Sequence, residues 1–114
     1  MRHTILACAL AMLSGGVSAQ VAVENDYPTV ARADYVFGCM ATNGQNRQAL
    51  EKCACSIDVI ASILPYDAYV EAETIMSMRQ VGGERMAIFR TSPEFSAIVA
   101  DLRRAQAEAE IRCF

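Results

Sequence analysis

The chain has 114 residues and a formal net charge of −3 at pH 7, and hydrophobic residues make up 54% of the sequence. A chain of this length forms one domain and has no room for a second core. The acidic balance argues against nucleic acid as a partner, because phosphates favour a basic surface.

The N-terminus has the three-part layout of a secretory signal. A short basic start precedes an apolar run over residues 5–13, and small residues follow up to Ala19. This run is far shorter than the roughly 20 residues that a membrane-spanning helix needs. We therefore expect residues 1–19 to be a cleaved signal peptide. Residues 20–114 should form a single periplasmic domain with no membrane insertion after cleavage.

Cleavage would also remove the chain's single histidine together with one arginine. The remaining chain would keep 9 basic and 13 acidic residues, a formal charge of −4, and it has no tryptophan. Without histidine it has no imidazole base and no Ser-His-Asp or Cys-His pair. We therefore predict a binding protein and not an enzyme.

Four cysteines remain in the expected mature chain: Cys39, Cys53, Cys55 and Cys113. An even number of cysteines in a short exported chain indicates a disulfide framework. A four-sulfur zinc site usually pairs its ligands as C-x-x-C, which is not the spacing here. Cys53 and Cys55 lie about 200° apart around a helix and cannot easily bond each other. We prefer Cys39 with Cys53 and Cys55 with Cys113, and the crossed pairing remains open.

Apolar periodicity and helix-stop signals predict an all-α domain of four to five helices, in an orthogonal or bundle arrangement, stapled by two disulfides. After an extended polar arm over residues 20–27, the first helix should follow Pro28 and end at the Asn43-Gly44 pair. The second helix should cover residues 45–64. The apolar residues of the first are Val30, Ala33, Phe37, Met40 and Ala41, and the buried stripe of the second is Leu50, Cys53, Ile57, Ile60 and Leu64.

The second half of the chain has equally clear boundaries. Pro65 should open a third helix over residues 66–80, and two glycines stop it. A short helical turn over residues 84–90 should pack Met86, Ile88 and Phe89. The last helix should begin at Ser92 as N-cap, and its apolar stripe is Phe95, Ile98, Val99, Leu102, Ala109 and Cys113.

Carboxylates are the remaining candidates for charged ligands. Asp67 and Glu71 lie four residues apart on one helical face, where two oxygens could hold a hard cation such as calcium or a lanthanide. Glu73 lies on a neighbouring face, and no EF-hand loop is present. The alternative is that these side chains are simply solvated. Another charged series, Asp101, Arg104 and Glu108, is typical of an exposed charge ladder.

Three segments carry a resemblance to a known group of proteins: Cys53–Asp58, Leu64–Tyr69 and Glu71–Thr74. They resemble small exported helical proteins of methylotrophic bacteria, the landiscernin-like periplasmic proteins found near genes for lanthanide uptake and lanthanide-dependent methanol oxidation. The resemblance covers about half of the expected mature chain. It implies a periplasmic metal-trafficking or dehydrogenase-accessory role with surface carboxylates as ligands.

Two functional hypotheses follow. The first is a non-enzymatic periplasmic protein that binds lanthanide or calcium through Asp67 and Glu71, with Glu73 as a further candidate, and that brings two copies together around the ion. The second is a protein-interaction module: an accessory subunit, inhibitor or small chaperone for a larger periplasmic partner. The high apolar content motivates the second, because so short a domain cannot bury all of it.

Overall fold

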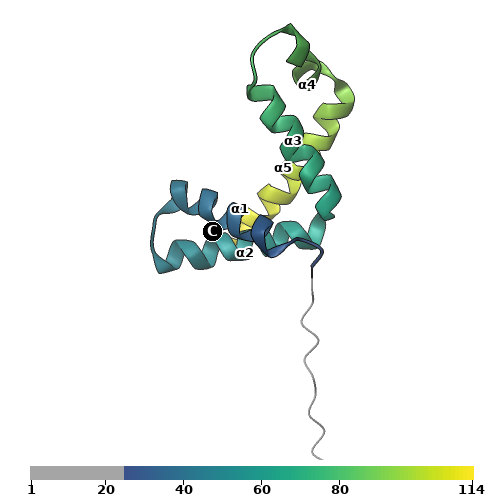
Figure 1. Ribbon diagram of the computed structural model, residues 1–114. Coiled ribbons are helices and arrows are strands. Elements are labelled where there is room, and N and C mark those ends of the chain that lie inside the picture. The colour runs from purple at the N-terminus through teal and green to yellow at the C-terminus, as the bar shows by residue number, and fades with distance from the viewer. Residues whose placement is uncertain (1–24) are drawn as a thin grey trace, which may run out of the picture.

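Residues 25–114 are described by the structure, a computed structural model, and within them the regular structure is entirely helical (Figure 1). The elements are α1 (Thr29–Asn43), α2 (Arg47–Ile63), α3 (Tyr66–Gln80), the short 3-10 helix η1 (Glu84–Met86), α4 (Ala87–Thr91) and α5 (Pro93–Cys113). The predicted all-α, disulfide-stapled domain is confirmed. The predicted signal peptide and the first part of the predicted arm, residues 20–24, lie outside the described residues.

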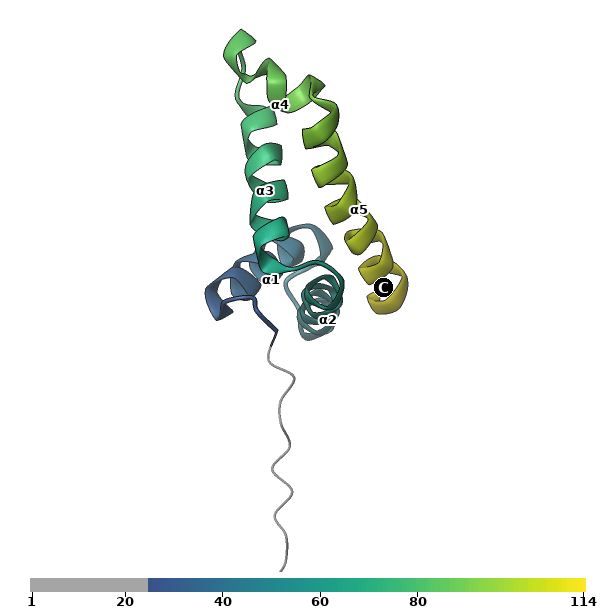
Figure 2. The ribbon, with the colours of Figure 1, turned by 90° about the vertical axis from the view of Figure 1, so that its right-hand side faces the viewer.

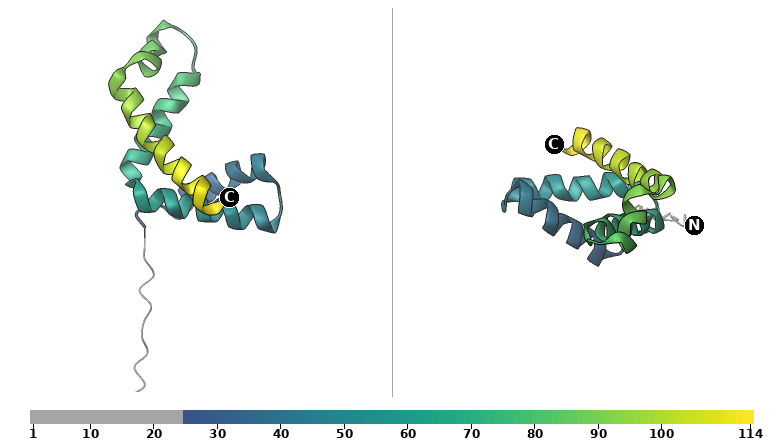
Figure 3. Two further views of the ribbon diagram at one scale, coloured as in Figure 1. Left: turned by 180° about the vertical axis from the view of Figure 1, so that it is seen from behind. Right: turned by 90° about the horizontal axis from the view of Figure 1, so that it is seen from above.

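Two helical hairpins set at an angle give the molecule its L shape. In Figure 1, α1 and α2 form one arm, and α3, α4 and α5 form the other. Figure 2 shows α3 and α5 side by side, joined through α4 at the far end of that arm. The C-terminal part of α5 returns to pack on α2, as the view from behind in Figure 3 shows. Helix α2 therefore contacts both arms.

The corner between the arms is sharp. Helices α2 and α3 are bent by 112° relative to each other across Pro65. Within residues 25–114, no single helix is long and apolar enough to cross a bilayer, and only this bent pair taken together reaches that length and composition.

Local signals place the helix ends close to where the sequence predicts them. Gly44 follows α1 with a φ of 114°, which a side chain at that position would resist. The Asn46 side chain accepts a hydrogen bond from the Ala49 amide at 2.8 Å. Because Asn46 is the N-cap, α2 begins slightly later than predicted. At α5 the predicted cap is confirmed, since the Ser92 hydroxyl accepts from the Phe95 amide at 3.3 Å.

The core lies at the corner, where α2, α3 and α5 meet. The largest fully buried side chains include Ile60 and Leu102, and alanines on α3 and α5 fill the remaining contact. Small side chains let the helix axes approach closely, so that α5 can pack on both α2 and α3. The core cluster consists of Tyr27, Ile57, Ile60, Leu64, Ala72, Leu102, Ala105 and Ala109.

The segment before α1 contributes to this core, contrary to the prediction from its sequence. Residues 20–27 were expected to form an extended polar arm, yet Tyr27 is only 2% exposed and donates a hydrogen bond from its hydroxyl to the Leu64 carbonyl at 2.8 Å. The Asp26 carboxylate accepts from the Tyr66 amide at 2.9 Å. Asp26 therefore satisfies a free amide at the start of α3, where Pro65 offers no side-chain cap.

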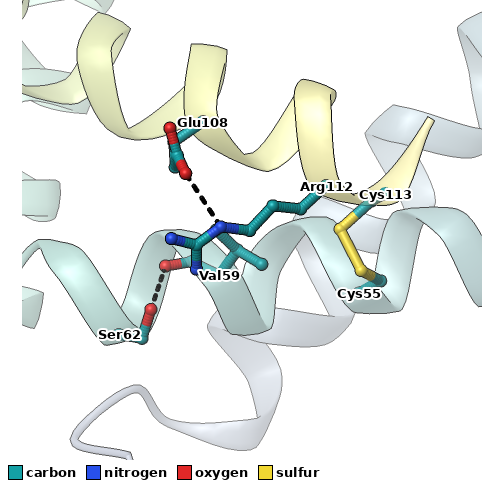
Figure 4. Close-up of polar contacts among 6 residues, drawn as sticks. All are labelled: Cys55, Val59, Ser62, Glu108, Arg112 and Cys113. Carbon is teal, nitrogen blue, oxygen red and sulfur yellow. Dashed lines mark hydrogen bonds and ion pairs between the residues drawn. A yellow bond between two sulfur atoms is a disulfide. The ribbon is translucent and has the colours of Figure 1, made fainter.

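Both disulfides have the preferred pairing, Cys39–Cys53 and Cys55–Cys113. The first joins α1 to α2, and the second joins α2 to the end of α5 (Figure 4). Next to the second bridge, Arg112 on α5 donates to the Glu108 carboxylate at 2.8 Å. Two cysteines separated by one residue thus fasten α2 to helices on two different sides.

Candidate functional site

Helix α1 lies at the edge of the molecule and contains no buried residue. It is held to α2 by the Cys39–Cys53 bridge and by a hydrogen bond of 2.9 Å between the Tyr35 and Ser56 hydroxyls. On its outer side, Val30 is 77% exposed and Phe37 is 75% exposed. Because α1 contacts α2 through one side only, the apolar residues predicted along it do not enter the core.

Three of them, Ala33, Phe37 and Met40, instead form one wall of an open groove between α1 and α2, whereas Val30 lines another groove. The groove has a volume of about 550 Å³, and most of its lining is apolar. We call this surface the α1–α2 face. It is lined by Thr29, Arg32, Ala33, Val36, Phe37, Met40, Leu50, Ala54, Ile57 and Asp58. Leu50, predicted to be buried, is 37% exposed because it faces this groove.

The α1–α2 face carries one charge of each sign, Arg32 on α1 and Asp58 on α2. Arg32 donates from Nη2 to the Thr29 hydroxyl at 3.3 Å. Its Nε is buried and has no hydrogen-bond partner among the described residues. A buried donor without an acceptor is unfavourable.

A second groove runs between α1 and α3, at the inner side of the corner. Its larger part has a volume of about 580 Å³, and an adjoining hollow has about 360 Å³. Both parts are lined by Asp34 of α1 and by Tyr69 and Glu73 of α3. We call the two parts together the α1–α3 groove. Sequence reasoning missed Asp34, because nothing in its local pattern shows that α1 will face α3.

A cluster of tyrosine rings forms one end of the α1–α3 groove. Tyr66 and Tyr69 stack with their centroids 6.3 Å apart, and Tyr27 contacts each of them at 5.1 Å. The hydrogen bond from Tyr27 to the Leu64 carbonyl fixes this cluster against the core. The rings are therefore held in place before any ligand arrives.

Electrostatic coupling links the side chains in the middle of the groove. Burial raises the pKa of Glu73 above its ordinary value, the Arg103 guanidinium lowers it in part, and the nearby Asp34 carboxylate raises it further. Burial also raises the pKa of the Tyr69 phenol, and the negative charge of Glu73 adds to this effect. Both groups are thus shifted mainly because their side chains are partly withdrawn from water.

The structure places the predicted metal ligands in different surroundings. Asp67 and Glu71 are exposed on α3 and are absent from the lining of the α1–α3 groove, whereas Glu73 is half-buried within it. No group of three or more histidine, cysteine, aspartate or glutamate side chains gathers anywhere in residues 25–114 in a way that could hold a metal ion. The lanthanide or calcium site at Asp67 and Glu71 stays a prediction.

The charged series on α5 is an exposed ladder, as predicted. Arg104 pairs with Asp101 one turn away, and Glu108 pairs with Arg112 instead of with Arg104. Asp101, Arg104 and Arg112 are more than half exposed and Glu108 is partly exposed, so the pairs contribute little to stability.

No known protein family, curated protein or solved structure matches the chain. The resemblance to the landiscernin-like proteins therefore stays a prediction as well.

Proposed function

We propose that the chain is a protein-interaction module that works as a pair, in which the α1–α2 face of one copy binds the same face of a second copy. The observation that carries this proposal is the outer side of α1. A 15-residue helix with no buried residue presents Phe37, 75% exposed, on this face, while a disulfide fixes the helix to α2. Exposed apolar groups of this size on a rigid surface are typical of an interface.

The spacing of the apolar residues favours a second helical hairpin as the occupant. On α1, Ala33, Phe37 and Met40 recur at intervals of three and four residues, and on α2 Leu50, Ala54 and Ile57 do the same; all six line the α1–α2 face. This spacing places the residues along one seam of each helix. Two hairpins packed seam to seam form a four-helix bundle, which buries both seams at once.

Charge also favours a second copy. The single positive and single negative side chains of the α1–α2 face sum to no net charge, so two copies do not repel each other there. In a twofold contact both copies use the same residues, so each contact from the first copy to the second is repeated from the second to the first.

The paired module would act in an oxidising compartment. Two disulfides in so small a domain support export, and the periplasm is the compartment that the N-terminal signal predicts. The residues of the α1–α2 face all belong to α1 and α2, so a pair joined there would leave the α3–α5 arms of both copies outside the contact. This arrangement suits an accessory protein that presents two identical arms, and it needs no catalytic group.

Sedimentation equilibrium under non-reducing conditions tests the proposal. The disulfide-bonded protein should sediment as a dimer at micromolar concentrations, and Phe37→Ser should make it monomeric. Ile111→Ser is the matched control, because Ile111 is 79% exposed on α5 and does not line the α1–α2 face. A wild-type protein that stays monomeric, or a Phe37→Ser variant that stays dimeric, would contradict the proposal.

A further inference from the structure

We infer that the α1–α3 groove binds an organic cation, with a positively charged ammonium group between Asp34 and Glu73 and an apolar portion along the tyrosine rings. The groove lies on another side of α1 from Phe37, and this inference does not depend on self-association. It begins from the cavity itself, whose main part, at about 580 Å³, falls within the volume range of small-molecule sites.

The charged side chains in the lining favour a ligand with a positive charge. Among the described residues, the charged side chains that line the α1–α3 groove are Asp34 and Glu73, and both are acidic. Arg103 of α5 is near enough to lower the pKa of Glu73, but it is not part of the lining. A cation would therefore find two negative groups and no competing positive one along the groove wall.

The rest of the lining selects an organic ion over a metal ion. A hard cation such as calcium needs about six to eight oxygen ligands, and only two carboxylates line this groove. Tyr69, Val70 and Met78 instead provide aromatic and apolar surface. Aromatic faces attract alkylammonium groups, and apolar walls bury the carbon atoms attached to the charge.

Tyr69 is the residue that can contact both parts of such a ligand. Its ring belongs to the tyrosine cluster, and its side chain also lines the hollow that contains Asp34 and Glu73. A bound ammonium group would also offset the repulsion from Asp34, which adds to the effect of burial on the pKa of Glu73. Binding should therefore weaken as the pH falls and Glu73 takes up a proton, with Asp34, Tyr69 and Arg103 as the other titratable groups around it.

Isothermal titration calorimetry with choline and spermidine tests the inference on the disulfide-bonded protein. At least one of these cations should bind, whereas 3,3-dimethyl-1-butanol, the uncharged analogue of choline, should not. Asp34→Asn and Glu73→Gln should each weaken binding at least about fivefold. Asp67→Asn combined with Glu71→Gln is the matched control, because it removes two exposed carboxylates from the same helix and should leave the affinity unchanged.

Three results would overturn the inference: no binding of either cation, equal binding of the uncharged analogue, or binding that the control variant abolishes. Heat from calcium or lanthanum alone, lost in the control variant, would instead support the hard-cation hypothesis at Asp67 and Glu71. If a groove variant fails to fold, the ring resonances of Tyr66 and Tyr69 in the wild-type protein decide the matter. They should shift on addition of the cation, and their failure to shift would also contradict the inference.

Discussion

The two disulfides should contribute to stability in different ways, and their removal is a test of how α1 is held. The Cys55–Cys113 bridge has a sequence separation of 58 and the Cys39–Cys53 bridge one of 14. With these loop lengths, the loop-entropy relation gives about 4 kcal/mol for the long bridge and about 3 kcal/mol for the short one. For the short bridge, about 3 kcal/mol is an upper limit, because α1 buries none of its own residues.

Replacing Cys55 and Cys113 by alanine should lower the free energy of unfolding by about 4 kcal/mol in a single cooperative transition. This bridge connects α2 to α5, which meet in the core. Replacing Cys39 and Cys53 by alanine should instead release α1 locally. The free energy of unfolding of the remaining helices should then fall by no more than about 3 kcal/mol. In this variant α1 is loose in the folded state and in the unfolded state, so the lost bridge affects both.

Urea denaturation combined with amide hydrogen exchange distinguishes these outcomes. In the variant without the Cys39–Cys53 bridge, amides of α1 should exchange rapidly while those of α2 and α5 remain protected. The measurement should be made at a concentration where the protein is monomeric, so that self-association does not protect α1. Protection of α1 equal to that of α2 in this variant would refute the reasoning, because the remaining contacts of α1, including the Tyr35–Ser56 hydrogen bond, would then be enough to hold it without the bridge.

Further substitutions test the core and the groove. Leu102→Ala should destabilise the protein by about 2 to 5 kcal/mol, measured by urea denaturation, whereas Val81→Ala at an exposed site should change stability by less than about 0.5 kcal/mol. Tyr27→Phe should lower stability by about 1 kcal/mol, because the carbonyl at the end of α2 loses its buried donor. The raised pKa of Glu73 means that the folded state holds this proton more tightly than the unfolded chain. Stability should therefore decrease as the pH rises from 4.5 through the raised pKa. Glu73→Gln should remove this part of the pH dependence. A variant whose profile of melting temperature against pH equals that of the wild-type protein would contradict this prediction.

Helix positions were predictable because their signals are local. Pro28 and Pro65 precede helices, Gly44 follows one, and Ser92 caps another, so each boundary can be read from a few consecutive residues. The disulfide pairing was also predictable in part, since the geometry of one helix excludes a bond between Cys53 and Cys55. Such inferences need no knowledge of how the helices are arranged.

Which side of each helix is buried depends on that arrangement, and here the sequence was a weaker guide. Ile88 was expected to pack, yet it is 56% exposed at the far end of the α3–α5 arm, where few helices are available to cover it. Tyr27 was assigned to a polar arm, yet it enters the core through contacts with residues some forty positions away. Neither outcome follows from periodicity alone.

The candidate surfaces also depend on how the helices are arranged and not only on local sequence signals. Glu73 was placed below Asp67 and Glu71 as a ligand because those two share a helical face. The bend between α2 and α3 turns a neighbouring side of α3 toward α1, which brings Glu73 and Asp34 to one groove. A pattern within one helix cannot show a site that two helices form together.

Isotope-filtered nuclear Overhauser spectroscopy tests the central claim, that the α1–α2 face joins two copies of this chain. Labelled and unlabelled protein are mixed, so that only contacts between copies are recorded. The Phe37 ring should show contacts to α1 or α2 of the other copy, and Ile111 should show none. Contacts between copies that involve Ile111 but not Phe37, or no contacts at all, would contradict the account.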